Sequence, residues 1–336
     1  MALRRISACI VAFSLSLAMY AAALDDDMIA RYPHVTISNG MVEAVVFVPD
    51  EKNGFYRSSR YDWSGVVGQI TYNGHTYFTK RASQMPHDPG NPGHGIGLVE
   101  EFDSANRVHI PERFDAAKPG ETFMKIGVGN LVKPDDGKPY HFAVPYVIAD
   151  RGKWKVKSGK NWIEFTHELT DAYGYGYRYV KRLELRKGKP ELVMSHSLKN
   201  TGKKPFSTDQ YCHNFFSIDR RETGPDTTVE LFFPARFKTD QAPVSVIRGR
   251  RITFERKVER GFMSYMEGYS DSTAHNRAVI RHAATRAGVD IGGDFSLFGF
   301  NFYADPYSCC PEFFVYRTID PSKTTKWKRT YVFFTE

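Results

Sequence analysis

Apolar and polar residues alternate in short runs along most of the chain, which is the pattern of β-strands. Met41–Val48 is an apolar, β-branched run that ends at Pro49-Asp50. Val66–Tyr72 leads into Asn73-Gly74 and then into His75–Phe78. Because Asn and Gly both tolerate the positive φ of a type I′ turn, Asn-Gly between two such runs predicts a β-hairpin.

The same pattern continues to the C-terminal end of the chain. Turn signals such as Lys187-Gly188 and Asp320-Pro321 separate the runs, and only the region around Ala274–Arg286 suggests a helix. Many short strands with turns about every ten residues predict an all-β fold, a large antiparallel sandwich or barrel with few short helices. The strands are predicted at Trp162–Leu169, Tyr175–Leu185, Leu192–Leu198, Val229–Phe233, Arg251–Phe254, Phe313–Arg317 and Arg329–Phe334.

The N-terminal segment has the layout of a secretory signal peptide. A charged start with Arg4-Arg5 is followed by an apolar run that closes in Ala21-Ala22-Ala23. A membrane anchor is the alternative, but the run is short for a spanning helix and Asp25-Asp26-Asp27 follows at once. We therefore predict a signal peptide at residues 1–23 and a secreted or periplasmic mature protein that makes no membrane contact after cleavage.

The rest of the chain is predicted to form one domain, residues 24–336. Its length of about 310 residues lies within the range that large all-β folds occupy as one unit, and no repeat or linker interrupts it. The formal net charge is +8, but Lys and Arg are not gathered into a tract. Clusters such as Arg248–Arg251 suit an anionic partner or, more commonly, solvated strand faces, so we expect no nucleic-acid partner. The oligomeric state is left open.

Cysteine usage gives no disulfide framework. The predicted mature chain keeps Cys212, Cys309 and Cys310, an odd set without the Cys-x-x-Cys spacing of structural zinc sites. In an oxidising compartment Cys212 can pair with Cys309 or Cys310, and three buried free thiols are the alternative. A Pro/Gly-rich loop carries His87, Asp88 and His94, which together with Glu100-Glu101 can line a pocket or hold a metal. Because the ligand spacing of known metal sites is missing, we predict no metal and no cofactor.

Two stretches carry the pattern of a known family. Leu198–Phe216 reads as a strand end, an Asn-Thr-Gly turn, a Pro, and a second strand that brings His213 before an aromatic pair. Ser308–Phe314 contains Pro311-Glu312 followed by two Phe residues, then a turn and a closing strand with a Trp. Both stretches resemble the corresponding motifs of the galactose mutarotase (aldose 1-epimerase) superfamily, and a more diffuse resemblance extends over most of the predicted mature chain.

The resemblance implies a galactose mutarotase-like β-sandwich, a carbohydrate ligand and two catalytic residues. His213 matches the family's catalytic acid, and imidazole titrates near neutrality, which suits proton transfer to a sugar ring oxygen. Glu312 matches the catalytic base. The alternatives are a histidine buried in an aromatic core and a glutamate that faces water. A histidine-rich sugar-binding segment of the family has no match here, and His141 is the candidate replacement.

Four further residues are candidate sugar contacts. Arg60 and Trp63 concentrate charge and aromatic surface ahead of a strand, where Arg can clamp hydroxyls or a carboxylate and Trp can stack on a sugar face. Tyr211 and Asn214 flank His213 in the matched stretch. The predicted activity is interconversion of sugar anomers. The alternatives are a polysaccharide-processing relative, such as a lyase or hydrolase accessory domain, and a non-catalytic exported carbohydrate-binding protein.

Overall fold

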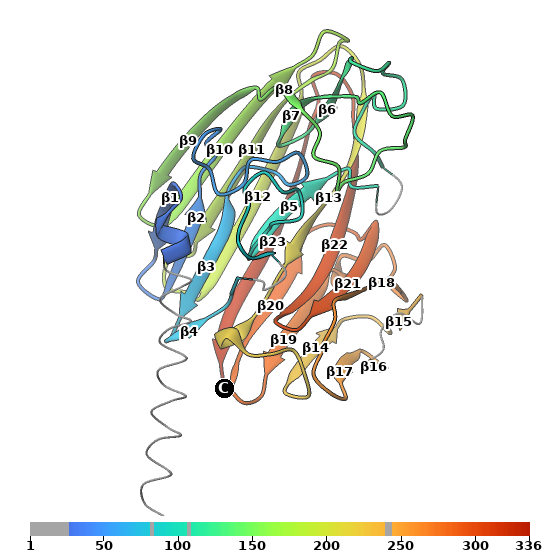
Figure 1. The fold of residues 1–336 in the computed structure, drawn as a ribbon. Coiled ribbons are helices and arrows are strands. Elements are labelled where there is room, and N and C mark those ends of the chain that lie inside the picture. Colours follow the sequence, from blue (N-terminus) through green and yellow to red (C-terminus); the bar gives the residue numbers. More distant parts are fainter. Residues whose placement is uncertain (1–26, 81–83, 106–108, 239–243) are drawn as a thin grey trace, which may run out of the picture.

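Two large antiparallel sheets pack face to face and form a β-sandwich, which confirms the predicted fold class (Figure 1). The computed structural model describes residues 27–80, 84–105, 109–238 and 244–336. The predicted signal peptide at residues 1–23 therefore lies outside the described residues. Among the described residues, no helix has the length and apolar character needed to cross a membrane.

We call the sheet that carries the candidate site the front sheet. Its strands are all antiparallel, and the short strand β4 (His75–Thr76) pairs with β3 at one side. In order, the sheet contains β1 (His34–Ser38), β2 (Val42–Phe47), β3 (Val66–Tyr72), β5 (Leu98–Phe102), β13 (Phe206–Asn214), β22 (Ser308–Ile319), β21 (Gly299–Asp305), β18 (Phe262–Glu267) and β15 (Arg236–Phe237).

The opposite sheet is the back sheet, and a three-stranded sheet lies at the end of the sandwich away from the C-terminus (Figure 1). The small sheet consists of β6 (Thr122–Lys125), β7 (Gly129–Val132) and β8 (Ile148–Asp150), and the single turns η2 (Ile218–Arg220) and η3 (Thr273–His275) are 3₁₀ helices. The back sheet runs in the order β16 (Ser245–Arg248), β17 (Arg251–Phe254), β14 (Thr227–Leu231), β19 (Arg277–His282), β20 (Ala287–Gly293), β23 (Thr324–Thr335), β12 (Glu191–Asn200), β11 (Gly176–Leu185), β10 (Trp162–Thr170) and β9 (Lys153–Gly159).

The predicted hairpin is present, whereas the predicted helix is wrong. Asn73 and Gly74 have φ values of 48° and 79° and connect β3 to β4, as a type I′ turn requires. The region Ala274–Arg286 forms only the end of η3 and then strand β19, which pairs with β14 and β20. The β-branched residues of β19 favour a strand, and its backbone hydrogen bonds to two neighbours override any local helical preference.

The main core fills the space between the two sheets. Successive side chains of a strand point to opposite faces, so Leu98 and Phe102 of β5 enter this core while Val99 points to the outer face of the front sheet. Phe102 meets Tyr179 of the back sheet edge to face, with ring centroids 5.3 Å apart. Val99 instead joins a second apolar cluster, in which loops of the N-terminal half cover the front sheet.

A charged network is buried between the sheets. Oε2 of Glu100 on β5 lies 2.8 Å from Nζ of Lys181 and 2.9 Å from Nε2 of His196, both on back-sheet strands. Nε of Arg329 lies 3.2 Å from Oε1 of the same carboxylate. Burial raises the pKa of Glu100, but His196, Lys181 and Arg329 outweigh it and hold the pKa well below its usual range. The network therefore joins the two sheets through a buried carboxylate that stays ionised.

The three cysteines of the predicted mature chain are free thiols, which was one of the two alternatives left open by the sequence. Cys212, Cys309 and Cys310 are buried and form no disulfide. Cys309 packs in the core between the sheets, and Cys310, the next residue of β22, packs in the cluster on the outer face of the front sheet. The two neighbours are thus separated by the sheet itself, which fixes their different surroundings.

Candidate functional site

Neighbouring strands of the front sheet bring His213 and Glu312 into direct contact. β13 and β22 are antiparallel partners, and His213 and Glu312 project to the same outer face of the sheet. Nδ1 of His213 lies 2.8 Å from Oε1 of Glu312, and both side chains are about 95 % buried, at 6 % and 5 % exposure. The two residues that the family motifs singled out, more than ninety positions apart in the sequence, therefore form one pair.

A second carboxylate holds the other nitrogen of the same ring. Glu101 projects from β5, the strand on the other side of β13, and its Oε2 lies 3.0 Å from Nε2 of His213. Tyr211 Oη and Arg60 Nε each donate a hydrogen bond of 2.8 Å to that oxygen. The imidazole of His213 is therefore placed between Glu101 and Glu312, with one ring nitrogen facing each.

Glu101 is held in its ionised form. Burial raises its pKa, but the charge of Arg60, the hydrogen bond from His213 and the charge of Lys125 outweigh burial and lower the pKa to about 2. Lys125 is fully buried nearby and donates hydrogen bonds to the carbonyl of Asp103 (3.0 Å) and to Tyr140 Oη (2.9 Å). The hydrogen bond between Glu101 and Nε2 fixes the orientation of the imidazole ring.

The pair opens into a small cavity on the outer face of the front sheet. Its volume is about 250 Å³, slightly below the range of drug-sized pockets, which suits a single sugar ring. His213 and Phe215, two residues apart on the same face of the chain, lie nearly parallel with ring centroids 5.3 Å apart. The lining is mostly aromatic with a few polar groups and consists of Arg60, Tyr61, Gln84, Gly93, Phe142, His213, Phe215, Met263, Asn301, Tyr303 and Glu312.

Arg60 lines this cavity and connects it to Glu101. Its side chain is 12 % exposed, and its guanidinium lies 4.1 Å from the ring centroid of Phe142 and 4.7 Å from that of Tyr61. Its Nε forms the ion pair with Glu101, 2.8 Å from Oε2. The planar guanidinium is therefore fixed by two aromatic rings and one carboxylate at the wall of the cavity.

The other predicted sugar contacts lie outside the cavity lining. Trp63 is 3 % exposed, and its indole Nε1 donates a hydrogen bond of 2.9 Å to the carbonyl of Ser58, so it belongs to the apolar cluster. His141 is exposed and stacks on Phe142 with centroids 4.6 Å apart. Tyr211 is buried beside His213, with ring centroids 4.5 Å apart, and donates a hydrogen bond to Glu101.

Asn214 points away from the cavity, because it follows His213 on the strand and takes the opposite face. Its amide Nδ2 donates a hydrogen bond of 2.6 Å to the carbonyl of Pro311, and its Oδ1 accepts one of 2.9 Å from Tyr331 on the back sheet. Asn214 therefore lies between the two sheets and not in the cavity wall.

The Pro/Gly-rich loop reaches the cavity through residues other than its histidines. Gln84 and Gly93 line the wall. His87 stacks on Phe55 with centroids 4.1 Å apart, and Nδ1 of His94 accepts a hydrogen bond from the backbone of Asp88 (2.9 Å). Both histidines thus stabilise the loop itself.

Several lining residues were missed by sequence reasoning, although strand periodicity was available for some of them. Cys310, which contacts the lining residue Glu312 without lining the cavity itself, lies two positions before it on β22 and so shares the outer face of the sheet. Asn301 of β21 is the register partner of Glu312. Tyr303 follows two positions later, but β21 was not predicted as a strand. Phe142 lies on a loop, where no periodicity indicates direction.

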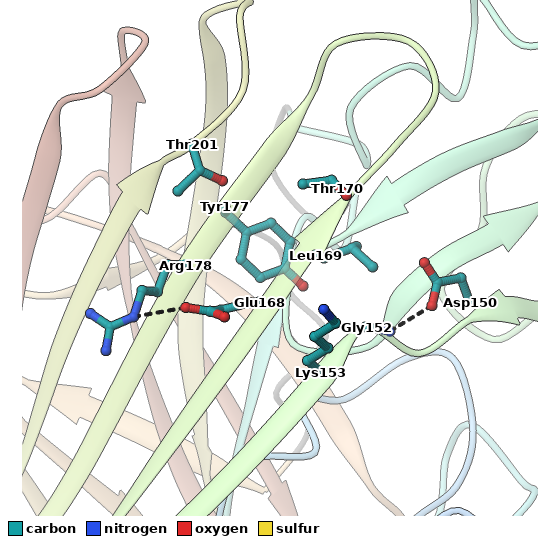
Figure 2. A pocket seen from close by; sticks show the side chains of 9 residues that line it. All are labelled: Asp150, Gly152, Lys153, Glu168, Leu169, Thr170, Tyr177, Arg178 and Thr201. Atoms are coloured by element: carbon teal, nitrogen blue, oxygen red, sulfur yellow. Dashed lines mark hydrogen bonds and ion pairs between the residues drawn. The ribbon is translucent and has the colours of Figure 1, made fainter.

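A second hollow of about 510 Å³ lies beside β9, β10 and β11 (Figure 2). Two of its charged side chains pair with each other: Arg178 Nε lies 3.0 Å from Glu168 Oε1, and both side chains are about half exposed. Asp150 accepts a hydrogen bond of 2.9 Å from the backbone of Gly152. The ion pair of this hollow is half exposed, whereas the cavity at His213 brings a buried imidazole and a buried carboxylate into contact, so the cavity at His213 is the candidate site.

Comparison with solved structures shows the fold. The chain is similar to a putative aldose 1-epimerase from Escherichia coli K12 (TM-score 0.56, 12% identity, 90% of this chain and 99% of that chain). It is also similar to a galactose mutarotase-like protein from Clostridium acetobutylicum (TM-score 0.55, 15% identity, 90% and 95%) and to the Slr1438 protein from Synechocystis sp. PCC 6803 (TM-score 0.56, 13% identity, 91% and 97%). No family model matches the sequence, and no curated protein matches it.

Proposed function

We propose that this chain, which has the galactose mutarotase-like fold, is an aldose 1-epimerase-like enzyme that interconverts the anomers of a free sugar. The observation that carries the proposal is the buried arrangement Glu101–His213–Glu312 at the wall of a ring-sized aromatic cavity. An acid and a base in contact, shielded from water, are what ring opening at an anomeric carbon requires.

The proposed reaction needs two proton transfers at one carbon. Glu312 takes the proton of the anomeric hydroxyl, and Nδ1–H of His213 gives its proton to the ring oxygen, so the ring opens to an aldehyde. The hydroxyl oxygen and the ring oxygen are both bonded to the anomeric carbon, so two adjacent side chains can exchange protons with them. After rotation about the bond next to the aldehyde, the hydroxyl returns its proton to Nδ1 and Glu312 returns its proton to the carbonyl oxygen. The sugar leaves as the other anomer, and the protein regains its starting state.

Glu101 has a positioning role in this scheme. It is ionised and faces Nε2, so it holds the ring with Nδ1 directed at Glu312 and the cavity. The hydrogen bonds from Arg60 and Tyr211 fix the carboxylate in turn. His213 therefore keeps a single orientation during both proton transfers, which is the preorganisation that efficient acid–base catalysis needs.

The cavity wall supports a carbohydrate ligand. Phe215 and Tyr303 meet edge to face, with centroids 6.1 Å apart, and offer apolar surface beside the pair. Arg60 and Asn301 supply polar groups at the same wall. Apolar rings with a few fixed polar groups are typical of small-molecule sites. The signal-peptide pattern at residues 1–23 supports a site of action in the periplasm or outside the cell.

The test is anomer exchange measured by exchange NMR at sugar equilibrium, with and without the protein. A panel of aldoses is compared with their methyl glycosides, which cannot open their rings. We expect faster exchange for at least one aldose and no reaction of its methyl glycoside, which still binds. If the protein bound an aldose and its methyl glycoside but did not accelerate anomer exchange, the proposed enzymatic activity would be contradicted. The carbohydrate-binding alternative would then remain.

A further inference from the structure

A third side chain with a metal-binding atom lies at the His213–Glu312 pair. Cys310 Sγ lies 3.6 Å from Glu312 Oε1. One ligand atom from each of the three residues, namely an imidazole nitrogen, a thiol sulfur and a carboxylate oxygen, lies within 4.8 Å of the other two. All three side chains are buried. The acid–base scheme uses His213 and Glu312, but it gives Cys310 no task.

We propose that His213 Nδ1, Cys310 Sγ and Glu312 form a three-ligand site for a divalent transition metal, with Zn²⁺ as the best fit. Zinc binds imidazole nitrogen, thiolate and carboxylate oxygen at about 2.0–2.3 Å, so ligand atoms around a tetrahedral ion lie about 3.5 Å apart. The sulfur–oxygen separation of 3.6 Å already has this value. The nitrogen–oxygen separation of 2.8 Å must widen by less than about 1 Å. One soft ligand with two harder ones favours zinc over magnesium or calcium.

The surroundings of the three ligands have the features of a metal site. Histidine ligands of metals usually donate their other N–H to a carboxylate, and Glu101 lies 3.0 Å from Nε2 of His213. The backbone N–H of Asn214 donates a hydrogen bond to Cys310 Sγ at 3.1 Å, which holds the sulfur in place. These contacts fix the imidazole and the sulfur before an ion binds.

The fourth coordination position faces the cavity. His213 and Glu312 both line it, so water or a small ligand can complete the coordination of the ion. The metal uses the same Nδ1 and the same carboxylate that the proposed reaction needs. Metal binding and proton transfer therefore exclude each other, and zinc inhibits anomer exchange. The inhibition rests on the proposed function, whereas the metal site itself does not.

Cys309 supplies a matched control for Cys310. The two residues are consecutive on β22, both are buried, and they face opposite sides of the front sheet. Cys309 packs in the core with Phe216 and other apolar residues, and burial raises its pKa. A serine at position 309 changes the chain as much as a serine at position 310, but it leaves the proposed ligand set intact.

The experiment is a titration of the untagged protein with Co²⁺, which reports a thiolate ligand through a sulfur-to-cobalt charge-transfer band in the near ultraviolet. We expect the band in wild type and in Cys309→Ser, its loss in Cys310→Ser, and its removal by one equivalent of Zn²⁺. Calorimetric titration with Zn²⁺ should show that Cys310→Ser weakens affinity by more than about 100-fold and Glu101→Gln by about 10–100-fold, the usual loss for an outer partner.

Results on the metal and on the sugar can be told apart. The same band in Cys310→Ser, or equal zinc affinity of the two serine variants, would overturn the metal site whatever the sugar assay gives. If Cys310→Ser does not fold, Glu312→Gln serves instead and should weaken zinc binding by at least about tenfold. Faster anomer exchange on adding zinc would overturn mutual exclusion. If metal-free protein did not accelerate anomer exchange, the proposed enzymatic activity would be contradicted. The metal site would still be tested by the cobalt band alone.

Discussion

Oε2 of Glu101 lies 3.0 Å from Nε2 of His213, so an ionised carboxylate on β5 fixes the imidazole on the neighbouring strand β13. The second nitrogen of that ring is thereby left to face Glu312 across 2.8 Å. This relationship assigns different tasks to the two carboxylates. In the proposed reaction, Glu101 orients the imidazole, and Glu312 exchanges protons with the sugar.

Glu101→Gln should reduce the rate of anomer exchange by about 100-fold with little change in KM. The glutamine keeps the size of the side chain, but it removes the negative charge that faces Nε2 of His213 and holds the ring in place. Tyr211→Phe is the matched control, because it removes one hydrogen bond to the same carboxylate and leaves the charge in place. If Glu101→Gln raised KM and left kcat unchanged, Glu101 would be assigned to sugar binding, which would contradict the positioning role.

Arg60→Met should lower the free energy of unfolding by about 3–5 kcal/mol, because it leaves the buried charge of Glu101 without its main partner. The double variant Arg60→Met, Glu101→Gln should recover much of this loss, since no uncompensated charge then remains. Urea unfolding of wild type, Arg60→Met, Glu101→Gln and the double variant gives the comparison. Equal stability of wild type and Arg60→Met would contradict the buried ion pair.

Stability should depend on pH through Asp209. Its carboxylate is fully buried, both oxygens lack a hydrogen-bond partner, and burial together with Asp103 raises its pKa to about 7. A carboxyl group with a folded pKa above its unfolded value stabilises the fold at low pH, and this contribution is lost as the pH rises through about 7. Wild-type melting temperature should therefore fall from pH 5 to pH 8 by more than that of Asp209→Asn. Parallel pH profiles of the two proteins would exclude this role of Asp209.

The sequence predicted the β-sandwich because strand periodicity and turn residues are local properties. His213 and Glu312 were found through motifs, and strand pairing that no local pattern specifies brought them into contact. Glu101 illustrates the limit: alternation places Glu100 and Glu101 on opposite faces of β5, but it does not tell which face carries the cavity. Trp63 illustrates a second limit. Its segment is charged and aromatic, but one hydrogen bond from the indole to the nearby carbonyl of Ser58 allows the ring to be buried, which the sequence alone does not reveal.

The central claim is that His213 and Glu312 act as one acid–base pair, and the anomer-exchange rates of His213→Asn, Glu312→Gln and the double variant test it most directly. Polarimetry of a freshly dissolved anomer gives these rates in metal-free protein, and calorimetry gives sugar affinity beside them. We predict that each single variant loses most of the rate while it still binds sugar, and that the double variant is hardly slower than either one. Losses that multiply in the double variant, or a wild-type protein that binds sugar without accelerating exchange, would contradict the claim.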